Sequence, residues 1–206
     1  MFSRCVLLLA VAVSLHAATV SLTGSLDPND ANDVFLYQFE VPAVSDLLFQ
    51  SYGFGGGTNA AGMIIPSGGF DPYLSLFAGA GPGATFLASN DDGSCPPGNF
   101  DPSCSDPTLS LTAQPAGSYT LALTVFDNFS FAENIGSGTL GDGFIGLGDY
   151  FNVASNEIRT SNFALDVSSS AGFVPEPGTV FLSAAAAAVL FQLRRRKGCL
   201  QPGKND

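Results

Sequence analysis

The stretch Gly117-Ser118-Tyr119-Thr120-Leu121-Ala122-Leu123-Thr124-Val125-Phe126-Asp127 alternates large apolar side chains with small or polar ones. Successive side chains of a β-strand point to opposite faces, so this period of two predicts a half-buried strand. The residues expected on its buried face are Tyr119, Leu121, Leu123 and Val125. Residues 34–41 repeat the pattern, and the side chains expected to face inward there are Phe35, Tyr37, Phe39 and Val41.

Shorter runs of the same kind occur along residues 19–173, separated by clusters of Gly, Pro, Asn and Asp that favour turns. They are residues 19–26, 46–52, 73–77, 86–89, 108–112 and 162–167. Short strands with such turns predict an all-β fold, an antiparallel sandwich or jelly roll. Residues 128–161 are rich in glycine and predict a long excursion between the last two strands. Its aromatic residues are expected to cover one end of the sandwich: Phe129, Phe131, Phe144, Tyr150 and Phe151.

The chain ends in three consecutive features: Val174-Pro175-Glu176-Pro177, an apolar run over residues 179–193, and Arg194-Arg195-Arg196-Lys197. The two prolines predict an extended, accessible strip. At a rise of ~1.5 Å per residue the apolar run would span about 22 Å as a helix, which is short for a hydrocarbon core of roughly 30 Å. We therefore expect a marginal transmembrane anchor. The basic cluster predicts a cytoplasmic tail over residues 198–206.

Two other interpretations of the apolar run stay open, namely a permanent membrane tail and a buried alanine-rich core helix. At the other end, residues 1–18 read as a secretory signal peptide, with Arg4 before an apolar stretch and Ala17 or Ala18 before the cleavage site. Together the two ends predict an exported domain over residues 19–173. We expect it to use Sec-type export machinery and to be held for a time in the inner membrane.

The expected exported part, up to Pro177, has 17 acidic residues and one basic residue, Arg159, which gives a charge of about −16. Such a surface repels nucleic acid, so nucleic-acid binding is excluded. The charge could serve solubility alone or divalent-cation binding. The only histidine, His16, lies in the predicted signal peptide, and both lysines lie in the tail. Catalytic triads, Schiff-base lysines and histidine-bound zinc are thereby excluded, and no enzymatic activity is expected.

Two cysteines fall inside the predicted domain, Cys95 and Cys104. In an exported protein this pair predicts a disulfide, with metal ligation a weaker alternative. Calcium is the one cofactor that the residues suggest. Oxygen ligands for calcium are supplied by Asp71, Asn90, Asp91 and Asp92, with Asp101 and Asp106 nearby in sequence. A second cluster comprises Asp27, Asn29, Asp30, Asn32 and Asp33. Ordinary turn chemistry is the alternative for both clusters.

The tail formed by residues 174–177, 179–193 and 194–197 closely resembles the PEP-CTERM sorting signal of bacteria. The resemblance implies an exosortase as processing partner and a destination at the cell surface or in the extracellular matrix. The runs Gly69-Phe70-Asp71-Pro72-Tyr73-Leu74-Ser75-Leu76-Phe77, Phe86-Leu87-Ala88-Ser89-Asn90-Asp91-Asp92-Gly93 and Ala116-Gly117-Ser118-Tyr119-Thr120-Leu121-Ala122-Leu123 resemble bacterial pre-peptidase C-terminal (PPC-like) domains over about residues 24–127. That resemblance implies a non-catalytic β-sandwich that binds calcium or an extracellular polymer in some relatives.

From these features we expect a structural or adhesive surface protein, with extracellular polysaccharide as a candidate partner. The alternative is a carbohydrate-binding or weakly carbohydrate-active module. It would use the aromatic residues Tyr52, Phe54, Phe129 and Tyr150, or a pair of carboxylates for hydrolysis.

Overall fold

The computed structural model describes residues 16–148 and 159–174. Most of the predicted signal peptide, the apolar run, the basic cluster and the cytoplasmic tail lie outside the described residues, as do Tyr150 and Phe151. Within the described part, no helix is long and apolar enough to cross a membrane.

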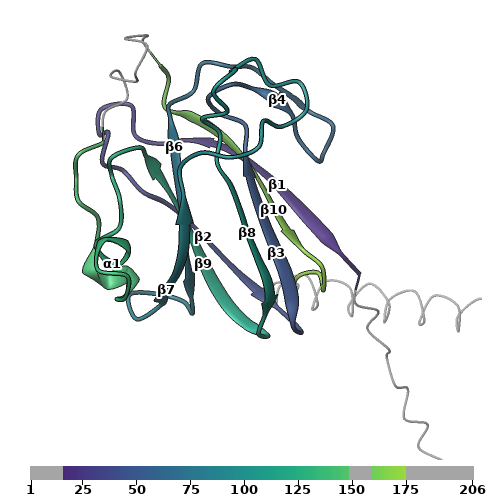
Figure 1. The fold of residues 1–206 in the computed structure, drawn as a ribbon, viewed down its shortest axis with the longest axis vertical. Helices are drawn as coiled ribbons and strands as arrows, with labels where there is room; N and C mark the ends of the chain where they lie inside the picture. The colour runs from purple at the N-terminus through teal and green to yellow at the C-terminus, as the bar shows by residue number, and fades with distance from the viewer. Residues whose placement is uncertain (1–15, 149–158, 175–206) are drawn as a thin grey trace, which may run out of the picture. The chain divides into compact units, whose positions relative to one another are not determined.

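Eight strands form two antiparallel four-stranded sheets (Figure 1). Sheet A has the order β1 (Ala18–Ser25), β10 (Asn162–Ser169), β3 (Ser45–Ser51) and β8 (Thr108–Gln114). Sheet B has the order β2 (Phe35–Val41), β9 (Gly117–Val125), β6 (Pro72–Ala78) and β7 (Thr85–Asn90). Each sheet interleaves early and late strands, as in double-sheet jelly rolls. All eight predicted strands are present, so the all-β prediction is confirmed.

A continuous apolar core joins the two sheets. The Phe39 ring of sheet B lies 5.9 Å from the Phe49 ring of sheet A and 5.6 Å from the ring of Tyr119. The inward residues predicted for 117–127 are all buried, and those predicted for 34–41 are buried or packed against the core. Burying each large apolar side chain stabilises the fold by about 1.5–3 kcal/mol, which is why the alternating pattern fixes both strands here.

Strand β9 is buried on both faces, where the sequence predicts burial on one. Ala122 on its outer face joins a second apolar cluster with Phe77, Ala84 and Ala132. Ala132 belongs to the one-turn helix α1 (Phe131–Asn134), which begins at Ser130 and lies in the excursion that follows β9 (Figure 1). The excursion therefore covers the outer face of sheet B rather than an end of the sandwich. The outward side chains of β9 are small, namely Thr120, Ala122 and Thr124, and they leave room for it.

The aromatic residues of the excursion have separate roles. Phe129 packs edge-on against Tyr73 of β6, with ring centroids 4.7 Å apart. Phe144 packs against the second apolar cluster, together with Leu140 of the short 3-10 helix η1 (Leu140–Asp142). Phe131 stays exposed. One helical turn is too short to produce a periodic pattern, so α1 was not predicted.

A two-stranded hairpin, β4 (Gly57–Thr58) and β5 (Ile64–Ile65), was not predicted either. It follows β3 and lies at one end of the fold, near the loop that connects β7 and β8 (Figure 1). Strands of two residues are too short to show alternation, and the glycine run before them reads as a turn.

Candidate functional site

The predicted disulfide between Cys95 and Cys104 is present, with the Cα atoms 4.8 Å apart. It closes the disulfide loop, residues 95–104, which packs on the residues that lead into the β4–β5 hairpin. The Phe100 amide donates to the Gly55 carbonyl at 2.9 Å, and the Thr58 amide donates to the Pro97 carbonyl at 2.9 Å. The disulfide therefore braces two loops against each other.

Asp106 connects these loops to sheet A. Its side chain is fully buried and accepts hydrogen bonds from four donors: the Ser51 hydroxyl at 2.7 Å, the Phe54 amide at 3.1 Å, the Gly55 amide at 2.8 Å and the Asn99 side-chain amide at 3.2 Å. Burial raises the pKa of Asp106, while the Ser51, Gly55 and Phe54 donors act to lower it. Its oxygens are used inside the protein, so Asp106 is a structural carboxylate rather than a ligand for a metal at the rim.

The predicted calcium residues Asp71, Asn90, Asp91 and Asp92 do gather at one edge of sheet B, which we call the acidic rim. Asp71 directly precedes β6 and Asn90 ends β7, and these two strands are antiparallel neighbours. Burial, followed by repulsion from Asp92 and Asp91, raises the pKa of Asp71 to about 7. The rim thus brings like charges together around a partly buried carboxylate.

Asn90 has a structural role at the rim. Its side-chain amide donates to the Thr108 carbonyl of β8 at 2.8 Å and to the Asp92 carbonyl. These bonds tie the end of β7 in sheet B to the start of β8 in sheet A. No group of three or more His, Cys, Asp or Glu side chains within residues 16–148 and 159–174 is arranged to hold a metal ion. Calcium binding at the rim therefore stays a prediction.

The second acidic cluster, residues 27–33, makes local turns. The Asn29 amide donates to Asp27 Oδ1 and the Asn32 amide to Asp30 Oδ1, both at 2.9 Å. Asp33 accepts from the backbone amide of Asp27 at 2.8 Å. Carboxylates that satisfy nearby backbone donors in this way are the turn chemistry that the sequence left open as the alternative.

Two of the aromatic residues considered for glycan contact are in the interior, which corrects that expectation. Tyr52 is 6% exposed and Phe54 is 8% exposed. The Tyr52 hydroxyl donates to Asp166 at 2.7 Å, and the Arg159 guanidinium lies 3.6 Å from the centre of the Phe54 ring. Phe129 packs against Tyr73, and Tyr150 is outside the described residues. These side chains do not form an exposed platform within the part that the structure describes.

Asp166 is an organising residue that the sequence did not reveal. It is buried in β10 and accepts from the Tyr52 hydroxyl and the Ala60 amide, each at 2.7 Å, and from the Ser21 hydroxyl. Burial raises the pKa of Tyr52, so its phenol stays a hydrogen-bond donor. The only signal in the sequence is a carboxylate at an outward position of a strand, which is ordinary for an exposed residue.

Of the predicted sorting motif, only Val174 is described. The compact unit that contains the sandwich ends at Phe173, whose ring packs against Phe39 with centroids 5.7 Å apart. Val174 is 40% exposed. Pro175, Glu176, Pro177 and the basic residues Arg194, Arg195, Arg196 and Lys197 lie outside the described residues.

No protein-family model matches the chain, and no curated protein matches it. Among solved structures, the chain is similar to PliG of Aeromonas hydrophila, a periplasmic inhibitor of g-type lysozyme. The match has 14% sequence identity and a TM-score of 0.32, and it covers 78% of this chain and 92% of PliG.

Proposed function

We propose that the chain is an exported bacterial surface or extracellular-matrix protein that an exosortase sorts and processes, and that its β-sandwich is a non-catalytic structural or adhesive domain. The observation that carries the proposal is the position of the tail. The sequence Val174-Pro175-Glu176-Pro177, followed by a short apolar run and a basic cluster, begins one residue after Phe173. The strip follows directly on Phe173, the last residue of the compact unit, and its two prolines favour an extended chain of the kind that a protease cleft binds.

The disulfide between Cys95 and Cys104 supports export. Structural disulfides persist in oxidising compartments and are rare in the cytosol of most bacteria. The acidic charge of the exported part also suits a protein that stays soluble outside the membrane. We propose that the protein is held transiently in the inner membrane by residues 179–193 before it reaches the surface.

The composition of the sandwich supports a non-catalytic role. Between residues 19 and 173 there is no histidine and no lysine, and both cysteines form the disulfide. Carboxylates remain for acid-base chemistry, but Asp106 and Asp166 are held by buried donors. A glycosidase needs two carboxylates that face a sugar cleft, so these two are unsuited to that role.

The test is mass spectrometry of the protein extracted from the surface of the producing cells. We expect a mature C-terminus between Val174 and Pro177. A variant with Pro175→Ala and Pro177→Ala should keep its tail and accumulate in the inner membrane. The matched control replaces two exposed loop prolines, Pro28→Ala and Pro82→Ala, and should be processed normally. Normal processing of the Pro175/Pro177 variant would overturn the proposed recognition.

Tyr52 and Phe54 are buried, so the aromatic platform first considered for carbohydrate binding is not formed by them. An uncharged groove on the sandwich favours it independently, in the form of glycan binding without cleavage. Such binding would complement a matrix role.

A further inference from the structure

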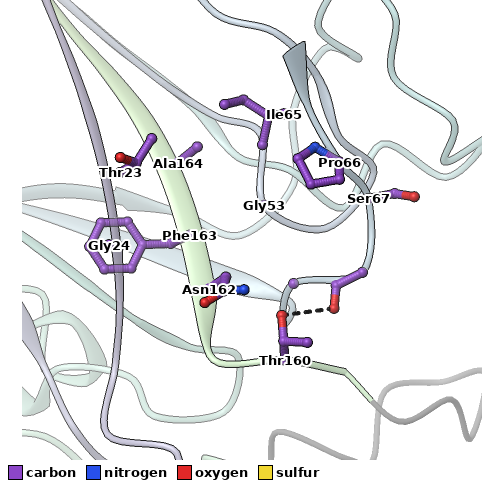
Figure 2. A pocket seen from close by; sticks show the side chains of 12 residues that line it. Thr23, Gly24, Gly53, Ile65, Pro66, Ser67, Thr160, Asn162, Phe163 and Ala164 are labelled. Atoms are coloured by element: carbon purple, nitrogen blue, oxygen red, sulfur yellow. Dashed lines mark hydrogen bonds between the residues drawn. The ribbon is translucent and has the colours of Figure 1, made fainter. Parts of the chain in front are cut away.

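A groove of about 690 Å³ lies between the start of β10 and the segment that leads from β5 to β6 (Figure 2). One wall comes from Thr23 and Gly24 of β1 and from Asn162, Phe163 and Ala164 of β10. Residues 65–69 form the opposite wall, and Gly53 also lines the groove. A volume of this size lies within the range of roughly 300–1,000 Å³ typical of ligand sites.

Backbone hydrogen bonds fix the wall formed by residues 65–69. The Gly69 amide donates to the Gly53 carbonyl at 2.8 Å, and the Gly68 amide donates to the Phe54 carbonyl at 3.1 Å. Gly68 in turn accepts from the Thr160 amide at 2.9 Å and from the Thr160 hydroxyl at 3.2 Å (Figure 2). The groove is thus held open in a set shape, as expected for a preformed site.

Glycine is required where this wall meets the sheet. A Cβ atom at Gly69 would lie 2.5 Å from the Asn162 carbonyl oxygen and 2.6 Å from the Gly53 carbonyl oxygen. Both are backbone atoms, so a side chain at position 69 would require a shift of the main chain. The close approach therefore depends on Gly69, and it places a surface of backbone and small side chains along the groove.

The groove differs from the rest of the domain in charge. None of its lining residues is ionisable, and residues 47–70, which supply one wall, contain no charged residue at all. The exposed polar side chains at its edges are hydroxyls and one amide: Thr23, Ser67, Thr160 and Asn162. Ile65 and Pro66 add apolar surface. This mixture suits an uncharged ligand with hydroxyl groups and C–H faces. The basic side chain beside the groove, Arg159, is engaged by the protein itself, since its guanidinium donates to the Phe54 carbonyl at 3.1 Å and to the Gly69 carbonyl at 3.5 Å.

We infer that this groove binds a neutral polysaccharide chain. The inference deepens the proposed surface function, on which it rests, by naming the site and the ligand class. Strand β10 begins at the groove with Asn162 and ends at Ser169, so at ~3.3 Å per residue the groove lies roughly 23 Å from the end where the chain leaves the sandwich.

The test uses the mature protein recovered from the cell surface, with the full chain in detergent as a second preparation. The probes are short neutral oligosaccharides prepared from the polysaccharide of the producing cells, alongside cello- and malto-oligosaccharides. Alginate fragments serve as the polyanionic control, and a neutral peptide rich in glycine and proline represents the other class of ligand. Titration calorimetry measures affinity, and hydrogen exchange reports whether the amides of Gly68 and Gly69, which are already hydrogen-bonded in the free protein, exchange more slowly when the sugar is bound.

Two variants address the groove directly. Thr23→Trp fills it from β1, and Asn162→Ala removes the amide from its edge. Each should weaken binding of the neutral oligosaccharide at least tenfold. The matched control is Thr112→Trp, at an exposed threonine on β8 that is not part of the groove, and it should bind like the parent protein. Near-ultraviolet circular dichroism and thermal midpoints confirm that each variant is folded.

The proposal is overturned if no neutral oligosaccharide binds to the folded parent protein, if the groove variants bind as well as the parent, or if the peptide binds in place of the sugar. These outcomes are separable from the sorting proposal. A correctly processed C-terminus without glycan binding would overturn only the groove. A retained tail with glycan binding would overturn only the sorting.

Discussion

Asp71 and Asp106 look alike in the sequence, since each precedes a proline at the start of a strand, yet their surroundings differ. Asp106 is fully buried among four hydrogen-bond donors. Asp71 is partly buried beside two other carboxylates, and no side-chain hydrogen bond to it occurs within the described residues. The first carboxylate organises the fold, while the second destabilises it at neutral pH. The donors that the fold supplies, and not the residue type, decide the role.

Removal of Asp106 has the largest expected effect on stability. Asp106→Ala leaves the Ser51 hydroxyl and the amides of Phe54 and Gly55 buried without an acceptor, and each such group costs about 1–3 kcal/mol. We expect urea denaturation to show a loss of roughly 3 kcal/mol or more. Asp91→Ala at the rim is the control, with a change below about 0.5 kcal/mol. If both variants lost the same unfolding free energy, the contrast between the buried Asp106 and the carboxylates of the acidic rim would be wrong.

The disulfide stabilises the same loops as Asp106, but it does so by restricting the unfolded chain and not by hydrogen bonds to a carboxylate. Replacing Cys95 and Cys104 by serine opens a loop of ten residues, which should cost about 2–3 kcal/mol on the chain-entropy estimate. Because Asn99 in this loop donates to Asp106, hydrogen exchange should increase around Gly55 and Thr58. The amides around Asp71 should keep their protection. A uniform loss of protection across both regions would contradict this separation.

Asp71 should make the protein less stable as pH rises. Its pKa is about 7 in the folded protein against an ordinary value of 3.8, so the folded state binds this proton more tightly than the unfolded state does. Stability therefore falls between about pH 4 and pH 7, and the full penalty is present above pH 7. Asp71→Asn removes it and should stabilise the protein at pH 8 by about 1–2 kcal/mol, after allowance for solvent screening. Below pH 4 the variant and the parent should have equal stability; a constant difference at every pH would point to packing instead.

Calcium offers the smallest and most specific test of the acidic rim. If the cation neutralises the repulsion around Asp71, millimolar calcium should raise the thermal midpoint slightly, by less than about 1 kcal/mol in stability, and excess chelator should reverse the rise. Magnesium should be a weaker substitute. The Asp71→Asn variant should not respond, whereas a calcium response that survives this substitution would move the site elsewhere. Identical midpoints with calcium and with chelator would leave the rim as a purely structural feature.

The sequence predicted the strands because large apolar residues at every second position, such as Phe39 and Leu121, can be buried only on one face of a sheet. It also predicted the disulfide, since Cys95 and Cys104 are the only cysteines within the expected domain. It missed α1 and the β4–β5 hairpin, because elements of one turn or two residues have no period. Their consequences are large, since the excursion that contains α1 buries Ala122, and the segment after β5 forms one wall of the groove.

The candidate sites were predicted less well than the strands, for a physical reason. A list of carboxylates gives no account of the donors around each one, so Asp106 and Asp166 could not be identified as buried acceptors. The same holds for Tyr52 and Phe54, which read as surface aromatics but fill the interior. The one sequence feature that pointed to the groove was weak, namely that residues 47–70 contain no charged residue. Its shape depends on long-range backbone contacts such as that between Gly69 and Gly53.

The central claim, that this is an exported protein released from its tail, is tested most directly by intact-mass measurement of the protein on the surface of the producing cells. We expect a chain that begins near Thr19, ends between Val174 and Pro177 before any attached group, and contains the oxidised Cys95–Cys104 pair. Recovery of surface protein that still carries Arg194 to Asp206 would contradict it.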